Sequence, residues 1–148
     1  MSETLVSVRL RQRRDFQFEI DFGGEVPLLV GDEPPPLGEG KGPSPVQLLA
    51  ASVGNCLSDS LLFALRKFKQ SPEPLKCDVV AQVGRNTEAR LRVVGIKATL
   101  TLGVPATSLL NLNRALEQFE SFCTVTQSVS PGIPVKVEVF DALGTRLK

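Results

Sequence analysis

The feature that most constrains the fold is a long apolar stretch from Pro45 to Phe68. Ser44, just before it, is a favoured N-cap residue, and proline suits the first helical position. The spacing of the apolar residues predicts a helix that ends near Lys69, before Pro72. The polar side chains within it fall on one narrow stripe, made of Ser52, Asn55, Asp59 and Arg66. We therefore expect a buried core helix and not a membrane span.

Alternating apolar and polar residues predict strands on both sides of this helix. Before it come two strands joined by a polar turn at Arg13-Arg14-Asp15, and then a short third strand near Pro27–Val30. A loop rich in proline and glycine, Gly31–Gly42, leads into the helix.

Two further strands, a second helix and a last strand are predicted after the long helix. They are Cys77–Val83, Ile96–Leu102, a helix opened by Pro105 and Thr107, and Val135–Val139. The fold class is therefore α+β in the order βββ-α-ββ-α-β, with an antiparallel sheet packed on two helices. The 148 residues fit one domain, 1–148.

Composition excludes several classes of function. The chain has no histidine, so a histidine general base, a Ser-His-Asp triad and histidine metal ligands are excluded. Three cysteines without histidine make a zinc site improbable, and we expect no metal and no cofactor. A formal net charge of +1 gives no support to nucleic-acid binding. The N-terminal residues do not resemble a signal peptide, so a cytoplasmic protein is expected.

The three cysteines carry the main chemical interest. Cys56 lies on the predicted long helix, at the border between the polar stripe and the apolar face, and Cys123 continues the apolar stripe of the second helix. Both can face a common core, although such a pair is not a CxxC motif. The simplest alternative is that each is a small buried hydrophobic residue. For Cys77, in a strand pattern beside Val79, we expect a structural role.

The segment from Gly42 to Cys56 resembles the central-helix signature of the OsmC/Ohr family (osmotically inducible protein C and organic hydroperoxide resistance protein). In that family a Pro-(Glu/Met)-(Glu/Gln)-Leu-Leu-x-Ala-x-x-x-x-Cys pattern opens the helix. Here it reads Pro45-Val46-Gln47-Leu48-Leu49-Ala50-Ala51 and continues to Cys56. The segment Ser121–Val125 resembles the region of the second cysteine, and the inferred element order matches over nearly the whole chain.

The resemblance implies an intertwined homodimer with active sites at the subunit interface and thiol-dependent reduction of organic hydroperoxides. Cys56 would then attack the peroxide and form a sulfenic acid, Cys123 would pair with it in a disulfide, and a small or protein dithiol would reduce the pair. This chemistry needs a thiolate, so the resemblance also implies a lowered pKa for Cys56.

One position departs from the family pattern. The hydroperoxide-reducing branches carry a glutamate ten residues before the first cysteine, paired with an arginine near the thiolate, and Val46 stands at that position here. Gln47 offers a hydrogen bond but no charge, and Val46-Gln47 is closer to a less characterised branch. The family arginine comes from the N-terminal hairpin, where Arg14 is the candidate.

The sequence leaves three functions open. The first is a thiol peroxidase with Cys56, Cys123 and Arg14 in its site. The second is a redox-sensing or apolar-ligand-binding dimer without peroxidase turnover, which Val46 favours. The third is a structural dimer in which the cysteines only pack the core.

Overall fold

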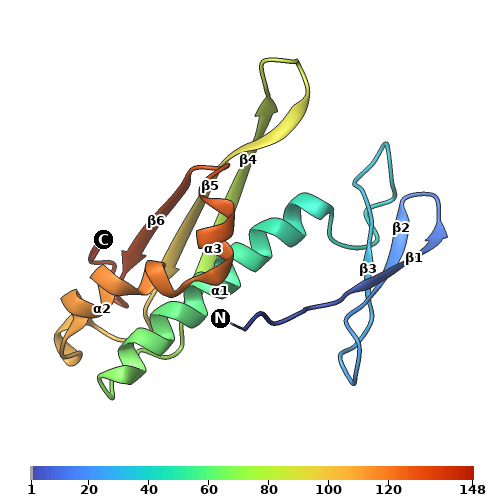
Figure 1. Ribbon diagram of the computed structural model, residues 1–148. Helices are drawn as coiled ribbons and strands as arrows, with labels where there is room; N and C mark the ends of the chain where they lie inside the picture. Colours follow the sequence, from blue (N-terminus) through green and yellow to red (C-terminus); the bar gives the residue numbers. More distant parts are fainter. Residues whose placement is uncertain (1) are drawn as a thin grey trace. The chain divides into compact units, whose positions relative to one another are not determined.

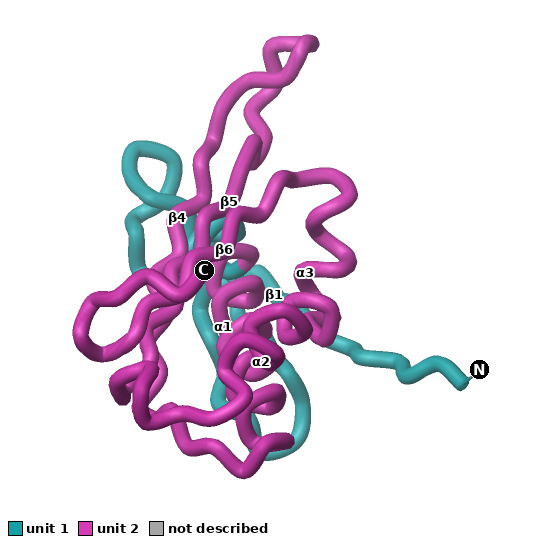
Figure 2. Tube along the Cα trace, turned by 90° about the vertical axis from the view of Figure 1, so that its left-hand side faces the viewer, with its two compact units in different colours: residues 1–48 teal, residues 49–148 magenta. Residues whose placement is uncertain are grey.

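The computed structural model describes residues 2–148, and the chain divides into two compact units, residues 1–48 and residues 49–148 (Figure 2). The expectation of one domain over 1–148 stays a prediction. The α+β fold class is confirmed, because two small sheets and a set of helices make up the chain (Figure 1).

The first unit is built around an antiparallel sheet in the order β1-β2-β3. Its strands are β1 (Arg9–Arg14), β2 (Gln17–Asp21) and β3 (Leu29–Gly31). The predicted hairpin and short third strand are confirmed, although β1 extends through Arg13 and Arg14, which the sequence placed in the turn. The turn residue Asp15 takes a left-handed conformation, with φ of 49°, which closes the hairpin after Arg14.

A buried carboxylate holds the loop that follows β3. Asp32 is almost fully buried and accepts backbone N–H hydrogen bonds from Glu33 at 2.8 Å, Lys41 at 3.1 Å and Glu39 at 3.2 Å. Burial alone would raise the pKa of Asp32, but these three hydrogen bonds outweigh burial and lower it. The loop rich in proline and glycine is therefore folded around one charged group, and Glu39 takes a defined place in it.

The long helix α1 (Pro45–Lys67) begins where the sequence predicts. Its first turn carries a capping box, in which the Gln47 N–H donates to Ser44 Oγ at 3.2 Å and the Ser44 N–H donates to Gln47 Oε1 at 2.9 Å. Among the described residues α1 is the one helix long and apolar enough to be compared with a membrane span. One face of it is fully buried in the core of the second unit, through Val53, Leu57, Leu61 and Leu65.

In the second unit α1 lies against a sheet in the order β4-β5-β6 (Figure 1). Its strands are β4 (Lys76–Arg85), β5 (Leu91–Thr101) and β6 (Val135–Phe140). The close approach of α1 to β4 depends on Gly54, because a Cβ atom there would lie 2.5 Å from Val79 Cγ2. Each apolar side chain buried in this core contributes about 1.5–3 kcal/mol to stability.

One strand pairing differs from the prediction of an antiparallel sheet. β4 and β5 are antiparallel, but β6 runs parallel to β5, with Ile96 opposite Val135 and Thr101 opposite Phe140. The physical reason is the connection, because residues 102–134 cross over with their short helices and return the chain to the end of the sheet where β5 began.

The prediction of one continuous second helix is wrong. The structure replaces it with four short pieces, η1 (Ala106–Ser108), α2 (Leu112–Gln118), η2 (Phe119–Phe122) and α3 (Thr124–Val129). Asn111 is left-handed, with φ of 59°, and Cys123 is extended, with φ of −82° and ψ of 99°, so the backbone turns at both places. Cys123 is therefore the N-cap residue of α3 and not part of a longer helical stripe.

Candidate functional site

Cys56 lies on α1 where the predicted polar stripe meets the apolar face. Its thiol is half-buried, its neighbour Leu57 is fully buried, and Asn55 is exposed. Asn55 Nδ2 donates a hydrogen bond of 2.8 Å to Asp59 Oδ2 one turn along the helix. Asn55 and Asp59, two residues of the predicted polar stripe, are thus paired with each other on the helix surface.

Cys123 is fully buried, and its sulfur serves as the N-cap group of α3. The backbone N–H of Thr126 donates to Cys123 Sγ at 3.4 Å. The Cys123 thiol in turn donates to Thr126 Oγ1 at 2.9 Å. Cysteine here takes the place that serine, threonine or aspartate usually holds at the start of a helix.

The fold brings these two cysteines together. Cys56 packs against the core cluster that contains Cys123, and the pKa of its thiol responds to the Cys123 sulfur and to the backbone N–H groups of Thr124 and Val125. Both thiols are free in this structure. Cys56 comes from the middle of α1 and Cys123 from the junction of η2 and α3, so two elements far apart in sequence form one dithiol site.

Three successive N–H groups at the start of α3 are divided between the two sulfurs. Those of Thr124 and Val125 lower the pKa of Cys56, and that of Thr126 donates to Cys123. These are N–H groups that a helix leaves without a partner in its own first turn. Sequence reasoning missed all three residues. The only signal was the spacing Cys-x-x-Thr, which is the spacing of an N-cap side chain and the N–H it accepts.

The expectation of a lowered pKa for Cys56 is corrected by the structure. Burial raises the pKa of the Cys56 thiol, and the hydrogen bond and charge of the Cys123 sulfur raise it further. The N–H groups of Val125 and Thr124 act in the opposite direction but do not outweigh burial. Residues 49–148 by themselves therefore hold Cys56 mainly as a neutral thiol near pH 7.

Arg14 lies in the first unit, at the end of β1. Its Nη2 donates to both carboxylate oxygens of Glu39, at 2.8 and 2.9 Å, and Gln17 Nε2 donates to the same carboxylate at 3.3 Å. The Arg14 side chain remains 64% exposed, so this ion pair adds little stability. It brings the Arg14 guanidinium group to the carboxylate of the loop that Asp32 organises. Gln47, the other polar candidate, uses its side chain in the capping box of α1.

Cys77 lies on β4, and its structural role stays a prediction. Its half-buried side chain packs against the core from β4, and burial raises the pKa of its thiol, partly opposed by a hydrogen bond with Ser58. A groove of about 340 Å³ opens beside it, lined by Ala51, Gly54, Asn55, Ser58, Cys77 and Val79.

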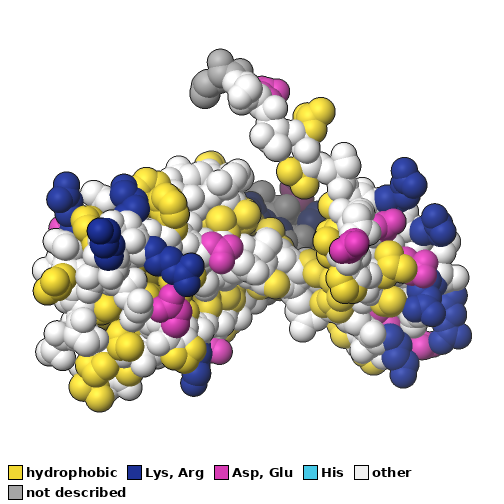
Figure 3. Space-filling view, turned by 90° about the horizontal axis from the view of Figure 1, so that it is seen from below, with side chains coloured by type: hydrophobic (Ala, Val, Ile, Leu, Met, Phe, Trp, Pro, Cys, Tyr) yellow, Lys and Arg dark blue, Asp and Glu magenta, His cyan; other side chains and the backbone are white. Residues whose placement is uncertain are grey.

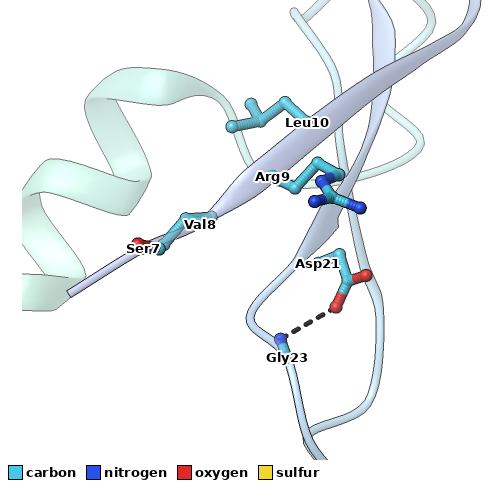
Figure 4. Close-up of a pocket in the computed structure, with 6 residues that line it drawn as sticks. All are labelled: Ser7, Val8, Arg9, Leu10, Asp21 and Gly23. Atoms are coloured by element: carbon cyan, nitrogen blue, oxygen red, sulfur yellow. Dashed lines mark hydrogen bonds between the residues drawn. The ribbon is translucent and has the colours of Figure 1, made fainter.

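Another groove lies in the first unit, beside β1. It measures about 590 Å³ and is lined by Ser7, Val8, Arg9, Leu10, Asp21 and Gly23 (Figure 4). There Asp21 accepts the Gly23 N–H at 2.8 Å and closes the turn after β2. The candidate site is placed at the two sulfurs, because these are the nucleophiles that the sequence singled out. Residues 2–148 contain no group of three potential metal-ligating side chains.

Comparisons with known proteins agree with the fold and with the quoted motif. A family model described as OsmC-like protein matches residues 38–138, which include both cysteines of the dithiol. No curated protein matches the sequence.

Solved structures of similar fold cover nearly the whole chain. An OsmC-like protein of unknown function from Vibrio cholerae is 18% identical, with a TM-score of 0.80, over 95% of this chain and 100% of its own. An organic hydroperoxide resistance protein OsmC from Legionella pneumophila is 18% identical, with a TM-score of 0.71, over 94% and 98%. The organic hydroperoxide resistance protein OhrB of Bacillus subtilis is 16% identical, with a TM-score of 0.70, over 92% and 98%. These likenesses establish the fold.

The pKa of Cys56 gives a test of this geometry. Cys123→Ala removes the sulfur that raises the pKa and keeps the N–H groups of Thr124 and Val125. We expect the pKa of Cys56 to fall, so that alkylation by iodoacetamide at pH 7 becomes about two- to tenfold faster. The measurement is the rate of Cys56 alkylation between pH 6 and 10 in a Cys77→Ser background.

Ser121→Ala is the matched control, because Ser121 is exposed and its hydroxyl donates only to the Gln118 carbonyl. An alkylation profile in Cys123→Ala that stays unchanged, or moves to higher pH, would contradict the contact between the two sulfurs.

Proposed function

This chain belongs to the OsmC family of proteins, and we propose that it reduces organic hydroperoxides with Cys56 and Cys123 as its redox pair. The observation that carries the proposal is that the fold packs two free thiols from distant parts of the sequence at one core, close enough for Cys123 to shift the pKa of Cys56. The names of the hydroperoxide resistance proteins among the structural relatives support the choice of substrate class.

The proposed reaction has three steps. The Cys56 thiolate attacks the distal oxygen of the hydroperoxide, and the O–O bond breaks. The alkoxide that leaves takes up the proton that the Cys56 thiol released and becomes the alcohol. The sulfenic acid formed on Cys56 is then attacked by Cys123, and a disulfide and water result. An external dithiol, small or protein-borne, reduces the disulfide by thiol–disulfide exchange and restores both thiols.

The surroundings of the sulfurs favour an organic peroxide over hydrogen peroxide. Cys56 packs against the apolar core of the second unit together with Leu49, Val125 and Val129. A bulky apolar group on the peroxide gains from leaving water in such a place, whereas hydrogen peroxide has no apolar surface to bury.

A cation is needed to favour the thiolate, because burial raises the pKa of Cys56. We propose Arg14 for this role. Its support is the family resemblance of the N-terminal hairpin and the ion pair in which Arg14 Nη2 donates to both carboxylate oxygens of Glu39. On this proposal Glu39 orients Arg14. The glutamate that pairs with the arginine in the hydroperoxide-reducing branches is replaced here by Val46, which has no carboxylate.

We also propose that the chain forms a homodimer in the cytoplasm. Its two units then belong to one domain. Apolar side chains are exposed on both units (Figure 3). Among residues 2–48 Ile20 is the one buried hydrophobic side chain, so this unit has almost no core of its own. In the second unit Phe63 and Phe122 stack edge to face at 5.9 Å while both remain exposed. Exposed apolar surface of this kind marks protein interfaces.

The alternative is a redox-sensing or apolar-ligand-binding dimer without peroxidase turnover. The raised pKa of Cys56 favours it, because a neutral thiol reacts slowly with peroxide. Turnover separates the two functions, since only an enzyme consumes many equivalents of hydroperoxide when a dithiol such as dithiothreitol is supplied.

The main prediction is a loss of two thiols per chain. In a Cys77→Ser background, one equivalent of cumene hydroperoxide should oxidise Cys56 and Cys123 to an intramolecular disulfide. Thiol titration and mass mapping under non-reducing conditions measure this. Cys123→Ser should lose one thiol and form no intramolecular disulfide. The proposal fails if the parent keeps both thiols, or if Cys56→Ser consumes peroxide as the parent does.

A second prediction concerns Arg14. Arg14→Gln removes the proposed cation, so the pKa of Cys56 should rise and the rate of its reaction with cumene hydroperoxide at pH 7 should fall about tenfold or more. Stopped-flow peroxide consumption gives the rate. Arg13→Gln is the matched control, one residue earlier in the same strand. Equal rates in both variants would remove Arg14 from the site.

A third prediction concerns assembly. Sedimentation equilibrium at micromolar concentration should give twice the mass of one chain, because a dimer covers apolar side chains that one chain leaves exposed. A monomer at these concentrations would refute the dimer.

A further inference from the structure

Thr126 makes two hydrogen bonds to the sulfur of Cys123. Its hydroxyl oxygen accepts the thiol proton at 2.9 Å, and its backbone N–H donates to the same sulfur at 3.4 Å. Both residues are buried, with exposed fractions of 6% for Thr126 and 0% for Cys123. Water therefore has little access to this pair, and the two hydrogen bonds determine how the sulfur is oriented.

The orientation follows from the bonding of a thiol. The sulfur of Cys123 carries its bond to Cβ, one proton and two lone pairs. The proton points at Thr126 Oγ1, and one lone pair accepts the Thr126 N–H. One lone pair is left, and Cys56, whose pKa the Cys123 sulfur raises, packs against the same core cluster.

We propose that Thr126 is a positioning residue, whose hydroxyl turns the Cys123 thiol so that its free lone pair faces the sulfur of Cys56. This inference rests on the proposed function, in which Cys123 closes the disulfide. In that step the free lone pair forms the S–S bond, the S–O bond of the sulfenic acid breaks, and the thiol proton of Cys123 leaves with the hydroxide as water.

The substitution Thr126→Val isolates the hydroxyl. Valine has nearly the shape of threonine, is also β-branched and keeps the backbone N–H that caps α3. It removes only the acceptor of the Cys123 proton, so the S–H group becomes free to rotate about the Cβ–Sγ bond while the sulfur keeps its hydrogen bond from the backbone N–H of residue 126. Thr126→Ser restores an acceptor at the same place.

Ser128→Ala is the matched control. Ser128 lies in the same short helix, is exposed, and donates from its hydroxyl to the Thr124 carbonyl at 3.0 Å. Its loss removes a hydroxyl hydrogen bond from α3 without touching either sulfur. A general loosening of the helix would therefore affect Ser128→Ala as well.

The first experiment follows disulfide formation after one equivalent of cumene hydroperoxide in a Cys77→Ser background, with dimedone to trap the sulfenic acid. Thr126→Val should close the disulfide about tenfold more slowly and accumulate dimedone-labelled Cys56, because a freely rotating thiol attacks from the productive orientation less often. The rate at which Cys56 first reacts should stay unchanged. Thr126→Ser should recover most of the parent rate.

A second experiment needs no peroxide and so separates this inference from the proposed function. Ellman's reagent, an aromatic disulfide, places a thionitrobenzoate group on Cys56, and attack by Cys123 then closes the Cys56–Cys123 disulfide and releases that group as a coloured thiol. The release should be about tenfold slower in Thr126→Val than in the parent, Thr126→Ser and Ser128→Ala.

The outcomes are distinct. A slow release in Thr126→Val supports the role of Thr126 even if the parent ignores hydroperoxide, a result that would overturn only the peroxidase. Equal release rates in Thr126→Val and the parent overturn the positioning role. Slow release in both Thr126→Val and Ser128→Ala overturns it too, because the effect would then belong to the helix and not to the hydroxyl.

Discussion

The dithiol site depends on the extended backbone at Cys123. Because the chain leaves helical geometry at this one residue, its sulfur caps α3 and three N–H groups become available to two sulfurs. A continuous helix through Cys123, as the apolar stripe suggested, would close those N–H groups into the helical ladder. Cys56 would then face a core without hydrogen-bond donors.

Burial works in two directions at this site. It keeps water from the sulfurs, which favours an apolar substrate and fixes the orientation of Cys123, but it also disfavours the thiolate on Cys56. The backbone donors of Thr124 and Val125 offset only part of that cost. In the second unit burial and Cys123 outweigh the two N–H groups, so the neutral thiol of Cys56 is favoured. Formation of the thiolate therefore requires a positive charge near Cys56. For this reason the proposal gives a defined role to an arginine that is already oriented by a carboxylate.

Much of the fold was predictable from the sequence. The capped start of α1, its buried face and the N-terminal hairpin follow from local signals, namely a capping box and two hydrophobic periodicities. The parallel pairing of β6 was not predictable in the same way, because it depends on where a long crossover returns the chain. The breaks at Asn111 and Cys123 were missed because tertiary packing overrides a regular apolar stripe. In the candidate site the two cysteines were identifiable, whereas their contact and the part of Thr126 require the fold.

The parallel pairing of β5 and β6 has a consequence for which part of the sequence places the second sulfur. The segment that carries Cys123 is a crossover anchored at both ends in adjacent strands. The pairing of the sheet is made by the strands alone, whereas Leu116, Phe119 and Cys123 of the crossover fill the core beside it. The second sulfur is thus set by the packing of the crossover and not by the register of the sheet, so the architecture and the dithiol chemistry rest on different parts of the sequence.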